Sequence, residues 1–157
     1  MPIDKIPHVP SANLFKIEPA SIQCVMQTAD YYNIPANALL AIVSNESGKN
    51  GHAIVNNNGT YDLGHMQINT STYASELAFM NISLEDIQWK GCLNVYAASY
   101  LVANRLNENA SLDFWTKLAN YHSRTPFYNA RYKQKLIAMA RQWENWLKVN
   151  YQVSYVR

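Results

Sequence analysis

No other feature restricts this chain as much as a carboxyl group that the sequence places at the end of an apolar helix. Residues 35–47 have helical period, beginning with a proline and followed directly by a glycine. Glu46 continues the apolar stripe of this helix, which is formed by Leu39, Ile42 and Val43. The helix therefore carries a carboxyl group into an apolar wall at the negative end of its dipole. Burial and the dipole both disfavour the charged form, and a general acid requires the protonated form.

A glycine-flanked polar strip follows this helix and reads DLGHMQIN over residues 62–69. The residues before the strip are rich in Asn and Gly, and Asn58-Gly59 is a strong hairpin signal between segments 53–55 and 60–61. We therefore expect one small β-hairpin directly after the helix that carries Glu46, where it lines a substrate groove.

The rest of the chain has helical patterns, so the sequence predicts a mainly α fold of the α+β, lysozyme-like kind. Further helices are expected over residues 20–32, from about 70, after a cap at 83, and over 89–107, 111–121 and 126–149. We expect one domain over residues 18–149, preceded by an extended lead-in over 1–17. We expect residues 150–157 to form a C-terminal tail or an edge strand.

Composition excludes several classes of protein. Hydrophobic residues make up 48% of the 157 residues and charged residues 15%, which is typical of a globular chain rather than a disordered one. The formal net charge of +2 is too small to indicate nucleic-acid binding. No apolar run approaches the roughly 18 residues that span a bilayer, so we expect no stable membrane insertion.

Two cysteines and four histidines give no metal-binding pattern. Cys24 and Cys92 lie in separate predicted helices, and either a disulfide or two buried thiols explains them. The spacing of the histidines does not form a metal-binding helix motif. We therefore expect neither a metal nor another cofactor.

In this order and at these separations, the motifs resemble the lytic transglycosylase domain of the goose-lysozyme-like superfamily. The resemblance covers roughly residues 20–140 and is closest to small members that serve secretion and conjugation systems. It is carried by Ile34-Pro35, Leu39-Leu40-Ala41-Ile42, Glu46-Ser47-Gly48, the strip over 64–69, Ala119-Asn120-Tyr121-His122-Ser123 and Asn129-Ala130-Arg131-Tyr132.

The resemblance implies that Glu46 is the single catalytic acid and base. It would protonate the glycosidic oxygen between N-acetylmuramic acid and N-acetylglucosamine, and then take the proton of the C6 hydroxyl. From the helix alone, an exposed glutamate at a helix end explains the pattern equally well. The second motif favours catalysis.

The resemblance also implies a set of substrate-binding residues. Tyr121 matches the family tyrosine near the acid, where its phenol would hydrogen-bond Glu46 and orient it. Met66 would form an apolar wall of the groove, although core packing is a comparable interpretation. The full set is Ser47, Gly64, Met66, Gln67, Asn69, Tyr121 and Tyr132. Two positions depart from the family, because His65 replaces an apolar residue and His122 an asparagine.

Three functions remain open. The leading one is a peptidoglycan lytic transglycosylase that opens the wall locally for a secretion, pilus or conjugation apparatus. Its partners would be glycan strands and a subunit of that apparatus. The second is a muramidase, in which Asp62 would activate water; we favour Asp62 as a turn residue that hydrogen-bonds local backbone. The third is a module that binds peptidoglycan or a partner without turnover.

The resemblance predicts a location in the periplasm or cell envelope of a bacterium. A disulfide and a peptidoglycan substrate both belong to that compartment. The first residues lack the basic start and apolar centre of a signal peptide, so we expect that a signal has been removed.

Overall fold

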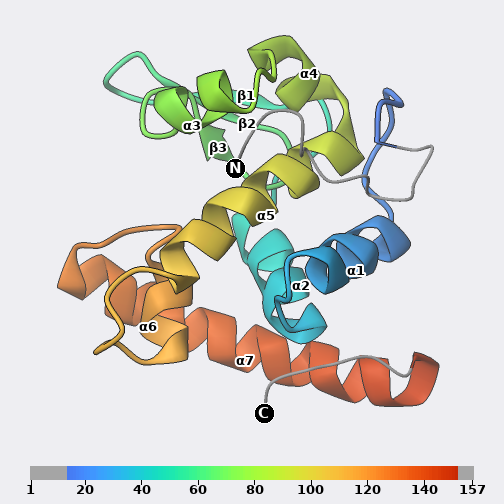
Figure 1. Ribbon diagram of the computed structural model, residues 1–157, viewed down its shortest axis with the longest axis vertical. Helices are drawn as coiled ribbons and strands as arrows, with labels where there is room; N and C mark the ends of the chain where they lie inside the picture. The colour runs from blue at the N-terminus through green and yellow to red at the C-terminus, as the bar shows by residue number, and fades with distance from the viewer. Residues whose placement is uncertain (1–13, 152–157) are drawn as a thin grey trace.

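A computed structural model describes residues 14–151 (Figure 1). The expectations for residues 1–13 and 152–157 lie outside this range. In chain order the elements are α1 (Ile22–Tyr31), α2 (Ala36–Glu46), β1 (Ala53–Val55), β2 (Tyr61–Leu63), β3 (Ile68–Asn69), α3 (Ala74–Phe79), α4 (Leu84–Trp89), α5 (Gly91–Leu106), α6 (Phe114–Ala119) and α7 (Pro126–Asn150). The prediction of a mainly helical α+β fold with a small sheet is confirmed.

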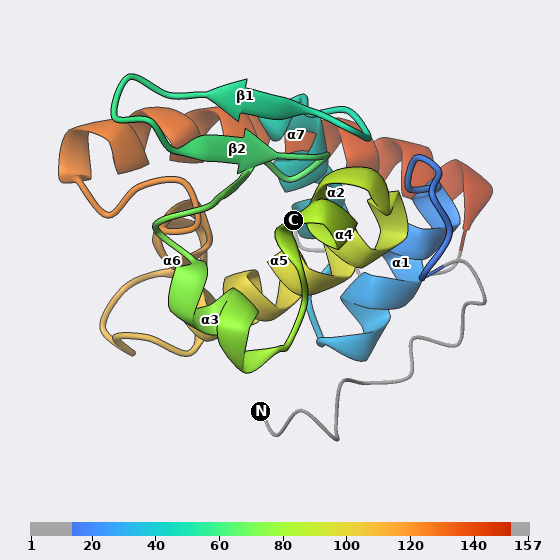
Figure 2. The same cartoon turned by 90° about the horizontal axis from the view of Figure 1, so that it is seen from above.

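The small sheet has three antiparallel strands in the order β1-β2-β3. The turn predicted at Asn58-Gly59 joins β1 to β2 and places Ile54 opposite Asp62. The sequence did not reveal β3, because it is only two residues long and pairs through a second tight turn at residues 64–67. Figure 1 shows the sheet at one end of the molecule together with α3 and α4, and Figure 2 shows β1 and β2 along one edge.

Local capping explains where several helices begin. Ser21 caps α1 by accepting a hydrogen bond from the Cys24 amide at 3.0 Å, so this helix starts later than expected. Ser83 caps α4 as predicted, with acidic residues in the first turn. The cap predicted at Ser111 is wrong. Asp113 caps α6 by accepting from the Thr116 amide at 3.0 Å.

The core surrounds α2. Figure 1 shows this helix between α1, α5 and α7. The predicted one-sided stripe was too narrow, because every residue from Ala36 to Ile42 is buried. Only the last turn, from Val43 to Glu46, is partly exposed. The core therefore holds the body of α2 on all sides and leaves its C-terminal end at the surface.

A disulfide between Cys24 and Cys92 joins α1 to α5, with their Cα atoms 6.0 Å apart. This resolves the two interpretations that the sequence left open. The bond lies in a second, smaller apolar cluster that contains Leu14, Leu93 and Tyr96. It closes a loop with a sequence separation of 68 residues, which restricts the unfolded chain strongly.

Between residues 14 and 151, none of the helices has both the length and the hydropathy of a membrane span.

Replacing both cysteines by serine tests the contribution of this bond. We expect the free energy of unfolding to fall by about 4 kcal/mol, because the reduced unfolded chain gains the entropy of the open loop. Urea unfolding of the two proteins measures the difference. A reducing agent should produce the same loss in the wild type and none in the double variant. A loss below about 1 kcal/mol would contradict this account.

Candidate active site

The chain stops α2 immediately after Glu46. Ser47 adopts a left-handed conformation with φ of 54°, and its amide donates to the Val43 carbonyl at 3.3 Å. The Ser47 hydroxyl donates to the Ser44 carbonyl at 2.9 Å, so it closes the end of the helix. The Glu46 side chain is 11% exposed. It is therefore close to solvent while most of its surface is covered by protein.

Gly48 allows the end of α2 to lie directly against the second turn of the sheet. A Cβ at this position would overlap the carbonyl oxygens of Gly64 and His65 and meet the amide of Gln67. The sequence Glu46-Ser47-Gly48 therefore places the acid beside the polar strip because the third residue has no side chain.

Asn94 of α5 forms hydrogen bonds with that turn and its neighbours. It is fully buried; its Oδ1 accepts from the Met66 amide at 3.0 Å, and its Nδ2 donates to the carbonyls of Leu63 and Ile87 at 2.9 and 3.0 Å. Gly64 has φ of +65°, and a Cβ there would overlap the Asn94 amide. Sequence reasoning missed this residue, although an asparagine within an apolar helix is a signal for a buried hydrogen-bond site.

A polar groove of about 370 Å³ opens beside Glu46. Among the predicted site residues, the groove brings together Glu46, Gln67, Asn69 and Tyr121. The residues that sequence reasoning did not assign as binding residues are Asn56, Asn58, Thr60, Asp62, Thr72, Tyr73 and His122. Amides, hydroxyls and two aromatic rings therefore surround the carboxyl group.

Three predicted binding residues point elsewhere. The Met66 side chain is fully buried, so it packs in the core and does not form a wall of the groove. Gly64 lies in the turn against Asn94, and the Ser47 hydroxyl is bonded to its own helix. These two serve the backbone path that places Glu46.

The predicted hydrogen bond between Tyr121 and Glu46 is wrong. The Tyr121 hydroxyl donates to the Met66 carbonyl at 2.8 Å, and this bond ties the connection after α6 to the second turn of the sheet. Burial raises the pKa of Tyr121 well above its ordinary value, so the phenol remains a donor.

Tyr132 of α7 lies beside the acid. Its hydroxyl is buried and has no hydrogen-bond partner of normal geometry within the described residues. Burial raises the pKa of Tyr132 well above its ordinary value, and the neighbouring Glu46 carboxyl raises it further. A small movement of the carboxyl would complete a hydrogen bond from this phenol.

His122 also lies next to the acid. Its Nδ1 lies 3.7 Å from the Glu46 Oε1, and its ring stacks on Tyr132 with centroids 4.3 Å apart and an angle of 7°. The His122 side chain is 46% exposed and faces the groove. The histidine that departs from the family pattern at this position therefore lies next to the acid.

Asp62 lies in β2 and lines the same groove. Its Oδ1 accepts from the Asn56 amide at 3.1 Å and from the Asn69 amide at 3.0 Å. The favoured interpretation, a turn residue bonded to local backbone, is wrong. Side-chain amides on either side of the strand hold this carboxylate towards the groove.

Comparison with known proteins identifies the family. Residues 23–135 match the family model described as the transglycosylase SLT domain. The chain belongs to this family. It is 41% identical over 80 residues to Protein IpgF of Shigella flexneri, which covers 50% of this chain and 52% of IpgF. It is 28% identical over 141 residues to Invasion protein IagB of Salmonella typhimurium, which covers 87% of this chain and 82% of IagB. The chain thus spans about half the length of IpgF.

The matched residues extend from α1 into α7. The matched region contains every residue that lines the groove, from Glu46 to His122. The geometry of the groove can therefore be interpreted as the site of that family.

Replacing Asn94 by alanine should cost about 3 kcal/mol of stability, because one amide and two carbonyls lose their buried partner. The turn that carries Gln67 also loses its support, so activity per folded molecule should fall. Urea unfolding and muropeptide release measure the two effects. Asn37→Ala is the matched control, because Asn37 is a buried asparagine that donates to the Ala140 carbonyl. We expect Asn37→Ala to lose stability and keep activity per folded molecule; equal losses of activity would contradict a specific role for Asn94.

The protonation of His65 should make the stability of the fold depend on pH. Burial lowers the pKa of His65, opposed by a hydrogen bond with the Gly48 backbone and reinforced by His52. Its Nε2 accepts from the Ala20 amide at 3.0 Å, which requires the neutral ring. As the pH falls below about 6.5, the unfolded chain binds the proton first, so the folded state loses stability.

In the variant His65→Gln, the side-chain oxygen can still accept from Ala20 but does not titrate. The loss of unfolding free energy between pH 7.5 and pH 5.5 should therefore be smaller than in the wild type. Urea unfolding at the two pH values gives the comparison. An identical pH dependence in both proteins would show that His65 does not contribute.

Proposed function

We propose that this chain is a lytic transglycosylase that cleaves the β-1,4 bond between N-acetylmuramic acid and N-acetylglucosamine and forms 1,6-anhydro products. The observation that carries the proposal is the position of Glu46. Its carboxyl is 11% exposed, it ends a buried helix, and it faces a polar groove in a chain of the SLT family.

One carboxyl group suffices for this reaction. Protonated Glu46 gives its proton to the glycosidic oxygen, the bond to C1 breaks, and the substrate's 2-acetamido carbonyl stabilises the positive charge at C1. The Glu46 carboxylate then takes the proton of the C6 hydroxyl as that oxygen bonds to C1. The proton count balances, and no water is consumed.

The surroundings of Glu46 suit both halves of this cycle. The Tyr132 phenol remains protonated because burial and the acid raise its pKa, so it can donate to the carboxylate when it forms. His122 approaches the same carboxyl from the groove side. The Tyr132 phenol would thereby stabilise the charge that develops on Glu46 when it loses its proton.

The rest of the groove suits a glycan. Gln67, Asn58 and Thr60 present amides and a hydroxyl, and Tyr73 and Tyr121 supply rings beside them. Sugar hydroxyls and acetamido groups need such donors and acceptors. The lining therefore supports a glycan strand rich in hydroxyl and acetamido groups as the substrate.

Hydrolysis is the second candidate, and Asp62 favours it. This carboxylate lines the same groove as Glu46 and is oriented by Asn56 and Asn69. A second carboxylate in the groove is what an inverting glycosidase uses to activate water. A muramidase would form reducing ends by the same bond cleavage. No contact within the described residues specifically favours a module that binds without turnover.

We place the enzyme in the periplasm or cell envelope, where it would open the wall for a secretion, pilus or conjugation apparatus. The disulfide supports an oxidising compartment. The similarity to a protein named for invasion supports a role beside such an apparatus, one of whose subunits would be a partner.

Mass spectrometry of muropeptides released from purified sacculi tests the reaction. The wild type should release 1,6-anhydro products, and Glu46→Gln should lower their rate by at least about 10²-fold because the amide cannot give or take the proton. Circular dichroism and the thermal midpoint show whether the variant folds. Activity retained in a folded Glu46→Gln would contradict the proposal.

Asp62→Asn separates the two candidate reactions. A transglycosylase should still form anhydro products in this variant, since Asp62 transfers no proton in that reaction. Products heavier by one water in the wild type, lost in Asp62→Asn, would identify a muramidase.

A further inference from the structure

One wall of the groove belongs to a connection without regular structure. Residues 120–125 join α6 to α7 and carry Tyr121 and His122. Tyr73 lies beside this wall, with its ring stacked on Tyr121 at 5.7 Å and 15°. Loops of this kind open more easily than helices, so a wall that faces the acid needs ties to the rest of the fold.

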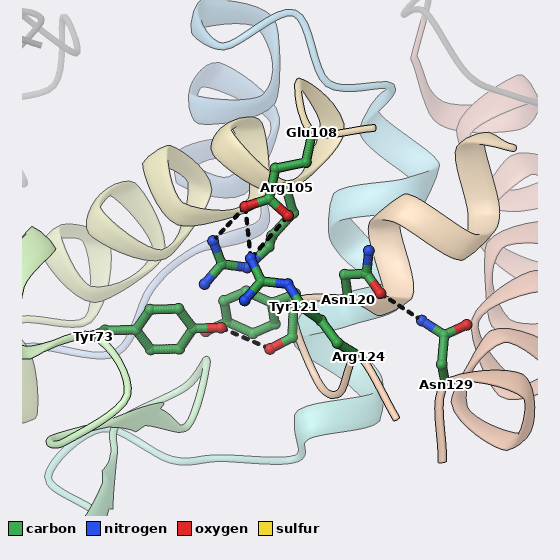
Figure 3. A network of polar contacts seen from close by, with 7 residues as sticks. All are labelled: Tyr73, Arg105, Glu108, Asn120, Tyr121, Arg124 and Asn129. Atoms are coloured by element: carbon green, nitrogen blue, oxygen red, sulfur yellow. Dashed lines mark hydrogen bonds and ion pairs between the residues drawn. The ribbon is translucent and has the colours of Figure 1, made fainter. Parts of the chain in front are cut away.

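Two of these ties come from neutral side chains (Figure 3). The Tyr73 hydroxyl donates to the Tyr121 carbonyl at 2.7 Å. Asn129 of α7 is buried, and its Nδ2 donates to the Asn120 side chain at 2.9 Å and to the Ser123 carbonyl at 3.1 Å. These bonds fix the path of the backbone on both sides of His122.

The third tie is ionic and comes from Glu108, which follows the end of α5. Both of its carboxylate oxygens accept from the Arg124 Nη2, at 2.6 and 2.8 Å. The Oε1 also accepts from the Arg105 Nη1 at 3.2 Å (Figure 3). The Glu108 carboxylate thus bridges Arg105 of α5 and Arg124 of the loop. Arg124 is two residues after His122.

Arg105 extends this tie into the wall. Its side chain is 7% exposed, and its guanidinium lies 5.3 Å from the centre of the Tyr73 ring. The contacts therefore form one continuous path from Arg124 through Glu108 and Arg105 to Tyr73, and from there to the Tyr121 carbonyl. Within the described chain, none of the three charged residues of this path lines the groove.

Charge explains why the bridge depends on Glu108. Two guanidinium groups share one carboxylate, so a neutral residue at 108 would leave two like charges facing each other. Burial acts to raise the pKa of Glu108, but the hydrogen bond from Arg124 and the charges of both arginines lower it below its ordinary value. The carboxylate therefore stays charged in mildly acidic solution.

We infer that Glu108 is a positioning residue: through Arg105 and Arg124 it holds Tyr73, Tyr121 and His122 against Glu46. The inference rests on the proposed function because its readout is turnover of the glycan, and it holds for a transglycosylase or a muramidase. The bridge is partly exposed, so we expect it to contribute little to overall stability. Its loss should instead loosen the wall that faces the acid.

A double-mutant cycle tests the inference with Glu108→Gln, Arg124→Gln and the combined variant. Turnover of soluble, uncross-linked glycan strands gives kcat and KM separately. We expect each single variant to lower kcat about 10- to 100-fold with KM within about twofold, since small displacements near a reacting bond cost this much. The combined variant should lose no more than the worse single variant, because both remove the same bridge.

Asp86→Asn is the matched control. Asp86 forms an ion pair with Lys90 at 2.9 Å, and its side chain is 40% exposed against 37% for Glu108. We expect this variant to keep the wild-type kcat. Thermal midpoints should shift by no more than about 4 °C in Glu108→Gln and Arg124→Gln.

The outcomes distinguish the inference from its alternatives. Losses of kcat that multiply in the combined variant would overturn it, as would a raised KM in Arg124→Gln alone, which would indicate direct binding of substrate. If Glu108→Gln does not fold, Arg124→Gln decides the question, because Arg124 is 60% exposed. An unchanged kcat in Arg124→Gln would overturn the inference. A wild type that releases no product from sacculi contradicts the proposed function instead.

Discussion

The close approach between the end of α2 and the second turn of the sheet is the constraint on which the site depends. Gly48 leaves no space for a side chain there, and Asn94 fixes the turn from the opposite side. The acid is therefore placed by two rigid bodies in direct contact, a helix buried on all sides and a turn bonded to α5. The path of the backbone alone brings Glu46 to the groove.

The sequence predicted the features whose signals are local. A proline and a glycine bound the helix of Glu46, Asn58-Gly59 marked the first turn of the sheet, and Ser83 marked the start of α4. Each of these depends on a few neighbouring residues, so backbone preference and the pattern of apolar residues suffice to find it. The same signals placed the hairpin next to the acid, which was enough to locate the groove.

The rest of the site depends on contacts between distant segments. The packing of α7 on α2 determines that Tyr132 lies beside Glu46, whereas the motif alone favoured Tyr121. Asp62 reaches the groove because β3, a strand of two residues, brings Asn69 beside it. Propensity contains no information about such contacts, and one sequence alone does not supply it.

The two walls of the groove differ in how readily they accept substitutions. The position of the wall that carries Glu46 depends on a contact that excludes any side chain at residue 48. Substitutions at this contact therefore disturb the fold as well as the catalytic reaction. The opposite wall is a six-residue connection in which Tyr121 is buried and His122 is exposed to the groove, and its bonds can be exchanged one at a time. Divergence within such a family can therefore proceed on the second wall, changing rate and preference for glycan, while the first wall conserves the reaction.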